Sequence, residues 1–263
     1  MRKKTITLLL LILIVPLISM SQISGRVIYI SILENENFVE LESTLYFNDS
    51  ESLFFVDMKN KESKENELDE LKLISDSEIE YQFDFTPKRP VKYEVYFNRS
   101  LESIISQNSI FKDWKSKPCV VGENSGSIKW NIHNEFRDIG SFNAQKATTS
   151  FRGRNYIAWF VSEVPISIGP WKFHGLPGLI LEIKDEELGV QFLFSSIQIP
   201  FETRGKILPP SDGELMSIEE FAKYQNNFSE EFIKTLKSKL PRSVVDPKIS
   251  VSQVVRSIER EYE

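Results

Sequence analysis

The sequence predicts a mainly β protein of the α+β class, in which a curved antiparallel sheet is followed by one or more C-terminal helices. Apolar and polar residues alternate in segment after segment up to Pro200, and a period of two is typical of strands with one buried face. Long amphipathic helices do not separate these segments, which favours antiparallel pairing over βαβ units. Beyond Pro200 the apolar residues recur at helical spacing.

The alternating segments define a β domain over residues 22–205. Its predicted strands cover residues 24–33, 39–47, 53–58, 79–85, 91–97, 117–122, 128–136, 144–151, 155–161, 179–183 and 190–199. Asn48 to Glu51 are polar turn formers, so the strands on either side of them should form a hairpin. No repeat of 20–50 residues is present, which argues against a solenoid or propeller.

Two stretches of this domain do not show the strand pattern. Residues 59–78 are dominated by Lys, Glu, Asp, Asn and Ser, a composition that buries too little apolar surface to offset the entropy of ordering. We expect a long mobile loop there, with a short helix over residues 65–74 as the alternative. Residues 100–114 fit either a helical turn or a partly buried connection.

The C-terminal region, residues 206–263, is predicted to be helical. Ser217 and Glu220 have the spacing of a capping box, and the apolar residues that follow them predict a helix over residues 218–240. Asn226-Asn227 is a candidate break in that helix. A weaker helix is expected over residues 251–262.

Residues 1–21 have the pattern of a secretory signal peptide. Basic residues at positions 2–4 precede an apolar run over residues 6–17, which has the length of a signal core and is shorter than the roughly 20 residues that cross a bilayer. Small residues favour cleavage between Ser21 and Gln22, and no cysteine stands there to carry a lipid. We therefore expect an exported mature chain without a transmembrane segment; an uncleaved membrane anchor is the alternative.

Composition limits the classes of partner. The chain has 32 Lys and Arg against 38 Asp and Glu, and loss of the signal peptide would make it more acidic still. An acidic surface repels phosphate groups, so neither nucleic acid nor an anionic membrane is an expected partner. The single cysteine, Cys119, excludes an internal disulfide and is expected to be a small buried apolar residue, with an exposed reactive thiol as the alternative.

The densest motif lies in residues 130–183. The hexapeptide Gly175-Leu176-Pro177-Gly178-Leu179-Ile180 resembles the signature of the GLPGLI family of exported Bacteroidetes proteins. Further motifs of that family occur in the same order at residues 146–149, 151–154, 158–160, 164–166 and 169–170. The resemblance implies a signal peptide and a location in the periplasm or cell envelope, and it carries no established biochemical activity.

The signature also has a physical interpretation. Pro177 followed by Gly178 suits a type II turn, in which the glycine takes a positive φ. Residues 164–178 would then form a rigid crossover, packed by Trp159, Phe160, Trp171 and Phe173. The crossover is either a folding device or the wall of a binding surface. On the second interpretation the candidate ligand- or partner-binding residues are Arg152, Arg154, Trp159, Trp171, His174, Gly175, Leu176, Pro177 and Gly178.

Positive side chains gather near these turns. Arg152 and Arg154 would point the same way if Gly153 did not bend the strand, and would form a clamp for a carboxylate or phosphate. The alternative is ion pairing with Glu163, Glu182 or Asp185. Asp185-Glu186-Glu187 is interpreted as a solvated hairpin loop.

The sequence contains no motif of a known catalytic or metal-binding site, and no motif in it implies a cofactor. The two histidines, His133 and His174, are the candidates for a metal or hydrolase site. Our leading hypothesis is non-catalytic binding of a partner protein, a peptide or a small apolar ligand in the periplasm or envelope. The alternatives are an envelope hydrolase or metal-dependent enzyme using either histidine, and a structural envelope component.

Overall fold

The computed structural model describes residues 23–33, 39–56, 69–75, 78–83, 93–112, 115–202, 205, 207–239 and 259. Its first strands are β1 (Gly25–Leu33), β2 (Val39–Phe47), β3 (Glu51–Val56), β4 (Asp69–Ser75), β5 (Glu78–Phe83), β6 (Glu94–Asn98) and β7 (Ser103–Lys112). They are followed by β8 (Lys115–Asn124), β9 (Asn131–Ile139), β10 (Phe142–Phe151), β11 (Arg154–Val161), β12 (Leu179–Asp185), β13 (Val190–Gln198), β14 (Glu214–Ser217) and the helix α1 (Ile218–Lys239).

The predicted fold class is confirmed. Twelve strands form one sheet in the order β14-β8-β7-β6-β3-β2-β1-β13-β12-β11-β10-β9, and β4 pairs with β5 in a separate ribbon. Side chains alternate between buried and partly exposed along β1 and β3, as the period-two pattern predicts. Pairing is antiparallel except between β14 and β8, which are parallel, so the expectation of antiparallel strands throughout is wrong at that edge.

The hairpin around Asn48 is confirmed. The side-chain oxygen of Asn48 accepts hydrogen bonds from the backbone N–H groups of Ser50 and Glu51, at 2.9 and 2.8 Å. The strands on either side, β2 and β3, pair antiparallel. The ambiguous residues 100–114 contain β7, a strand rather than a helical turn. Within residues 59–78, the described part includes β4, which contradicts both the loop there and the alternative helix over residues 65–74.

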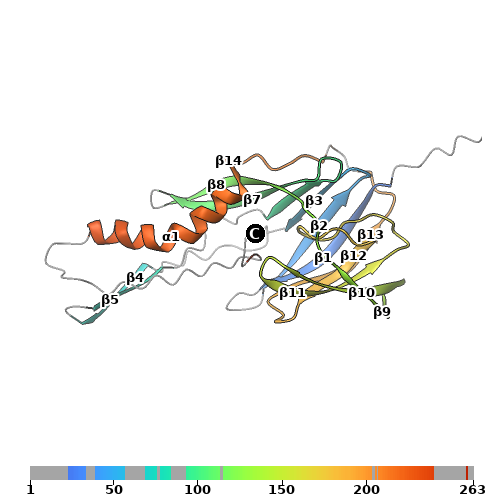
Figure 1. Cartoon of the computed structure of the whole chain (residues 1–263), viewed down its shortest axis with the longest axis horizontal. Coiled ribbons are helices and arrows are strands. Elements are labelled where there is room, and N and C mark those ends of the chain that lie inside the picture. The colour runs from blue at the N-terminus through green and yellow to red at the C-terminus, as the bar shows by residue number, and fades with distance from the viewer. Residues whose placement is uncertain are drawn as a thin grey trace, which may run out of the picture.

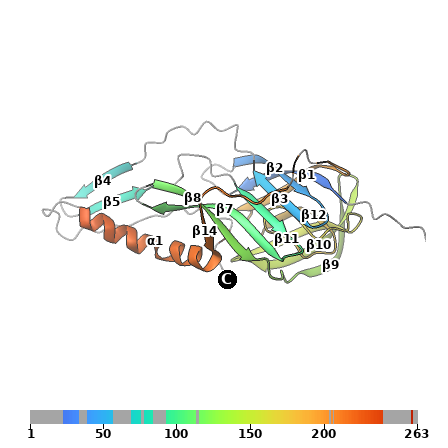
Figure 2. The same ribbon diagram turned by 90° about the horizontal axis from the view of Figure 1, so that it is seen from above.

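The large sheet is strongly curled about β1, its central strand (Figures 1 and 2). Phe54 on β3 and Phe192 on β13 have ring centroids 5.5 Å apart, although β2 and β1 lie between their strands. Three strand spacings in a flat sheet amount to about 14 Å. The Tyr29 hydroxyl on β1 likewise donates to the Ile180 carbonyl of β12, at 2.8 Å, past the intervening β13. The concave face therefore encloses the main core.

Residues 162–178, which connect β11 to β12 and are here called the crossover, lie in that concavity. Backbone hydrogen bonds fix them, among which Leu179 donates to Val164 at 3.0 Å and Ile180 donates to Ile168 at 2.9 Å. Phe173 and Leu176 are each 1% exposed. A long connection is usually a surface feature; this one supplies side chains to the core, so the predicted crossover is confirmed as a packed element.

Gly178 lets the crossover approach the backbone of Val161 closely, because glycine has no side chain. A Cβ built there would lie 2.1 Å from the Val161 carbonyl oxygen, whereas Gly175 is the glycine of the motif with positive φ, at 96°. The predicted type II turn at Pro177-Gly178 is therefore wrong, because Gly178 does not have the positive φ that such a turn requires.

The helix α1 lies at the end of the sheet and does not cross the concave face (Figure 2). Ser217 and Glu220 form the predicted capping box, with reciprocal backbone bonds of 3.2 and 2.9 Å. Phe221 packs against Ile110, Cys119 and Val121. The helix continues without a break through residues 226–227.

Cys119 is a fully buried apolar residue, as expected, and burial raises the pKa of its thiol to about 12. Among the described residues, no helix combines the length and apolar character that a membrane crossing requires. The predicted signal peptide and the predicted helix over residues 251–262, apart from Glu259, lie outside the described residues.

Replacing Gly178 by Ala should lower the free energy of unfolding by about 3 kcal/mol or more, because the contact is with backbone atoms that no side-chain rotation can move. Gly122→Ala is the matched control, since its Cβ would meet only Leu215 Cδ1 at 3.9 Å. Urea titration of both variants measures the difference. Equal stability of the two variants would contradict the close approach.

Candidate functional site

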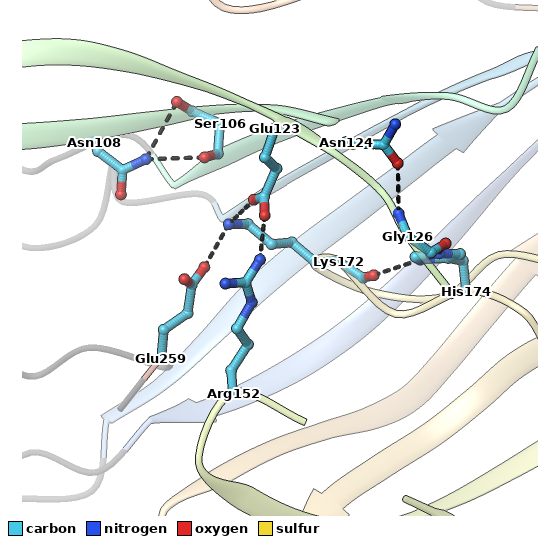
Figure 3. Close-up of polar contacts among 9 residues, drawn as sticks. All are labelled: Ser106, Asn108, Glu123, Asn124, Gly126, Arg152, Lys172, His174 and Glu259. Carbon is cyan, nitrogen blue, oxygen red and sulfur yellow. Dashed lines mark hydrogen bonds and ion pairs between the residues drawn. The ribbon is translucent and has the colours of Figure 1, made fainter. Parts of the chain in front are cut away.

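A group of buried charges lies where the crossover meets β8. It consists of Glu123, Arg152, Lys172 and Glu259, here called the charged cluster (Figure 3). Glu123 is near the end of β8, Arg152 is in the turn between β10 and β11, and Lys172 is in the crossover. Glu259 belongs to no helix or strand. Three separate parts of the β fold and one residue beyond α1 thus converge on one point.

Glu123 is the centre of the charged cluster. Its Oε2 accepts a hydrogen bond from Arg152 Nη2 and its Oε1 accepts one from Lys172 Nζ. Lys172 Nζ also lies 2.5 Å from Glu259 Oε1. The side chains of Glu123 and Lys172 are each 3% exposed, and those of Arg152 and Glu259 are 8% and 9% exposed. Two cations and two carboxylates therefore balance in a setting where unpaired charge would be costly.

The turn between β10 and β11 aims Arg152 at this centre. Arg152 and Gly153 have φ values of 50° and 74°, and two consecutive positive φ values are those of a type I′ hairpin turn. Gly153 therefore bends the chain, and the condition for a joint clamp by Arg152 and Arg154 is not met. The structure separates the two arginines, so the clamp prediction is wrong.

Arg154 forms a second buried ion pair. Its Nη1 lies 2.5 Å from Asp185 Oδ2, across the β11–β12 pair. Asp185 Oδ1 accepts the backbone N–H of Val190 at 3.0 Å. The ion-pair alternative is confirmed for Arg154, whereas Arg152 pairs with Glu123, which is not among the predicted partners. Asp185 is buried, so the interpretation of Asp185 as part of a solvated loop is wrong.

His174 is next to the charged cluster but is held by backbone groups. Its Nδ1 lies 2.9 Å from the Lys172 carbonyl oxygen and its Nε2 lies 3.3 Å from the Gly126 carbonyl oxygen. Asn124 Oδ1 accepts the Gly126 N–H at 2.9 Å and so fixes that loop (Figure 3). A neutral ring donates from only one of these nitrogens, and that nitrogen has no lone pair for a metal. The His174 ring also packs on Phe97, with centroids 4.8 Å apart.

The other histidine is elsewhere. His133, on β9, has its Nε2 2.8 Å from the Thr148 hydroxyl on β10. The structure therefore does not bring the two histidines into one site. Across the described ranges, no group of three or more His, Cys, Asp or Glu side chains is arranged to hold a metal ion.

The remaining candidate residues divide between the crossover and the outer face. Trp171 packs edge-on against Phe173, with ring centroids 5.1 Å apart. Trp159 follows the opposite face of β11 from Phe160, and the Arg137 guanidinium covers its ring at 4.3 Å. Trp159 is also partly buried against the main core, which includes residues of the crossover. Leu176 fills the core, while Gly175 and Pro177 are exposed.

Arg152 retains hydrogen-bonding capacity. Its Nε and Nη1 are buried and have no hydrogen-bond partner among the described residues. Buried donors without acceptors are unfavourable by about 1–3 kcal/mol, and by more on a charged group. The acceptor group that matches the planar guanidinium best is a carboxylate.

Comparison with known proteins places the best-defined similarity on these same elements. Residues 152–182 match the model of a family described as "Protein of unknown function (Porph_ging)". The match begins at Arg152, covers β11 and the crossover, and ends within β12. None of the curated proteins shows detectable sequence similarity to this chain.

Solved structures give a weaker similarity. Two structures of PNGF-II, in the C2 and P21 space groups, align with 78% of this chain at 13% and 15% identity, with TM-scores of 0.47 and 0.46. The chain spans about a third of the length of those chains, 32% and 33%. Similarity at this level does not establish a common fold.

Replacing Glu123 by Gln should lower the free energy of unfolding by about 3–5 kcal/mol, because Arg152 and Lys172 would remain buried with one negative partner fewer. Urea titration at neutral pH measures this change. The control is Glu135→Gln, which removes a carboxylate paired with Lys146 at the surface and should leave the stability nearly unchanged. Equal stability of the two variants would contradict a buried cluster centred on Glu123.

Proposed function

We propose that this chain is an exported, GLPGLI-type protein of the periplasm or cell envelope that binds a carboxylate-bearing segment of a partner protein or peptide at the charged cluster, without catalysis. The observation that carries the proposal is the pair between Lys172 and Glu259. Glu259, which lies outside the sheet, already places a carboxylate on the buried Lys172.

Two features favour a carboxylate as the ligand group. Arg152 and Lys172 are brought together by Glu123, which supplies only one negative charge to two positive ones. Arg152 also has two buried nitrogens without acceptors among the described residues. A ligand carboxylate that took the place of Glu259 would supply the second negative charge of the cluster together with acceptors for these nitrogens. Charge-assisted hydrogen bonds are about twice as strong as neutral ones.

The packing of the crossover makes a small apolar ligand the weaker choice among the predicted ligands. Phe173 and Leu176 occupy the concave face of the curled sheet, where such a ligand would have to bind. Trp171, at the edge of the charged cluster, leaves an aromatic side chain beside the cations. This combination suits a peptide or protein segment that presents an acidic residue next to apolar ones.

Export is the second part of the proposal. It is supported by the signal-peptide pattern of residues 1–21, and by the resemblance of residues 175–180 to the signature of an exported family.

The export proposal predicts that the mature chain begins at Gln22. Expression in a Gram-negative host followed by intact-mass measurement of the periplasmic fraction checks the cleavage position. Replacing Ser19 and Ser21 by large residues should block cleavage, because signal peptidase requires small side chains there. An unprocessed wild-type chain, retained in the cytoplasm, would contradict export.

The binding proposal predicts saturable binding of a fluorescent hexaglutamate peptide and no binding of hexaglutamine, each peptide having an amidated C-terminus. Lys172→Met and Arg152→Gln should each weaken binding roughly ten- to a hundredfold, because each removes charged hydrogen bonds. Higher salt should weaken binding as well. Fluorescence anisotropy, on variants shown by circular dichroism to be folded, measures the dissociation constants.

The matched control for this experiment is Lys146→Met, which removes the same charge from the surface pair with Glu135. It should bind hexaglutamate like the wild-type chain. Equal weakening by Lys146→Met and Lys172→Met, or equal binding of the two peptides, would contradict the charged cluster as the binding site.

A further inference from the structure

We propose that Glu259 is an internal occupant of the charged cluster, so that the cluster binds either Glu259 or the carboxylate of a ligand, and not both. The inference rests on the proposed function and adds its regulation. Glu259 would set the affinity of the site for its partner by competing with that partner.

The two carboxylates of the charged cluster differ in how firmly they are fixed. Glu123 is within β8, where its backbone is paired with Ile104 of β7, and its side chain contacts both cations. Glu259 lies outside every strand and outside α1, and its described contact in the cluster is with Lys172. Glu123 is therefore part of the fold, and Glu259 is the carboxylate that can be exchanged without breaking the sheet.

Because Arg152 and Lys172 are buried, a ligand carboxylate has to replace Glu259 rather than bind beside it. With Glu259 in place, the Lys172 side chain is 3% exposed and the Arg152 side chain is 8% exposed. A ligand carboxylate cannot reach either cation through so little accessible surface. It can pair with Lys172 Nζ as Glu259 does only in place of Glu259, so binding and release are linked.

Charge leads to the same conclusion. Arg152, Lys172, Glu123 and Glu259 have no net charge together (Figure 3). Without Glu259 the remaining three have one excess positive charge in a buried setting, which a ligand carboxylate would neutralise. A ligand carboxylate added while Glu259 stays would instead give an excess negative charge. The site is therefore balanced for one mobile carboxylate.

Linkage gives the expected size of the effect. The apparent dissociation constant of a ligand equals its intrinsic value divided by the fraction of molecules that are open. Removing the internal competitor raises that fraction, and couplings of this kind usually change affinity by about 5- to 150-fold. A variant without the Glu259 charge should therefore bind an acidic peptide at least about fivefold more tightly than the wild-type chain.

The test measures hexaglutamate binding to the full chain by fluorescence anisotropy, in the wild type and in Glu259→Gln. The control is Glu230→Gln, which removes an exposed carboxylate of α1 and should bind like the wild type. If Glu259→Gln does not fold, Glu259→Asp replaces it; its shorter side chain weakens the contact with Lys172 and should give a smaller gain in affinity.

The outcomes separate the two proposals. Tighter binding by Glu259→Gln, with Glu230→Gln unchanged, supports the internal occupant. Equal binding by Glu259→Gln and wild type, or weaker binding by Glu259→Gln, overturns it while leaving the binding function in place. Absence of binding by every variant overturns the proposed function, and the regulation that rests on it.

Discussion

The architecture depends on how the curled sheet is held closed. Its twelve strands form an open order from β14 to β9, so strand pairing alone does not join the two ends. The crossover between β11 and β12 fills the concavity, with Phe173 in ring contact with Tyr156 and Phe192. At its edge, Lys172 and the β10–β11 turn reach Glu123 of β8, on the opposite arm of the sheet. Apolar packing thus supplies the bulk of the closure, and the charged cluster adds polar contacts between the same parts of the fold.

Buried charges are a poor way to gain stability, which is why their placement here is informative. Replacing a buried ion pair by apolar residues of similar volume is often neutral or stabilising. The pair between Arg154 and Asp185 joins neighbouring strands and has a further backbone partner at Val190, so it has a local structural role. The charged cluster instead spans the fold and includes Glu259, together with buried Arg152 nitrogens that lack acceptors among the described residues.

Local sequence patterns predict much of the fold and little of the site. Alternation along β1 and the capping box at Ser217 are local signals, and the sequence predicted both elements. The four residues of β14 are too few to show a period. In sequence, Pro177-Gly178 has the pattern of a turn whose glycine takes a positive φ. The glycine is needed instead because a Cβ would collide with Val161, and the position of Val161 cannot be read from the local sequence. The partner of Arg152, 29 positions away on β8, follows from the curl of the sheet, for which no local signal exists. The only sequence feature that pointed to this contact was the concentration of basic residues around the crossover.

The central claim is that Arg152 and Lys172 form a carboxylate site that Glu259 occupies in the absence of a ligand. A crystal structure of the Glu259→Gln chain grown with hexaglutamate tests it most directly. We expect a peptide carboxylate within hydrogen-bonding distance of Lys172 Nζ and of Arg152 Nε or Nη1, with Glu123 unmoved. A peptide bound at another surface, or residue 259 still in place on Lys172 beside an unliganded cluster, would contradict it.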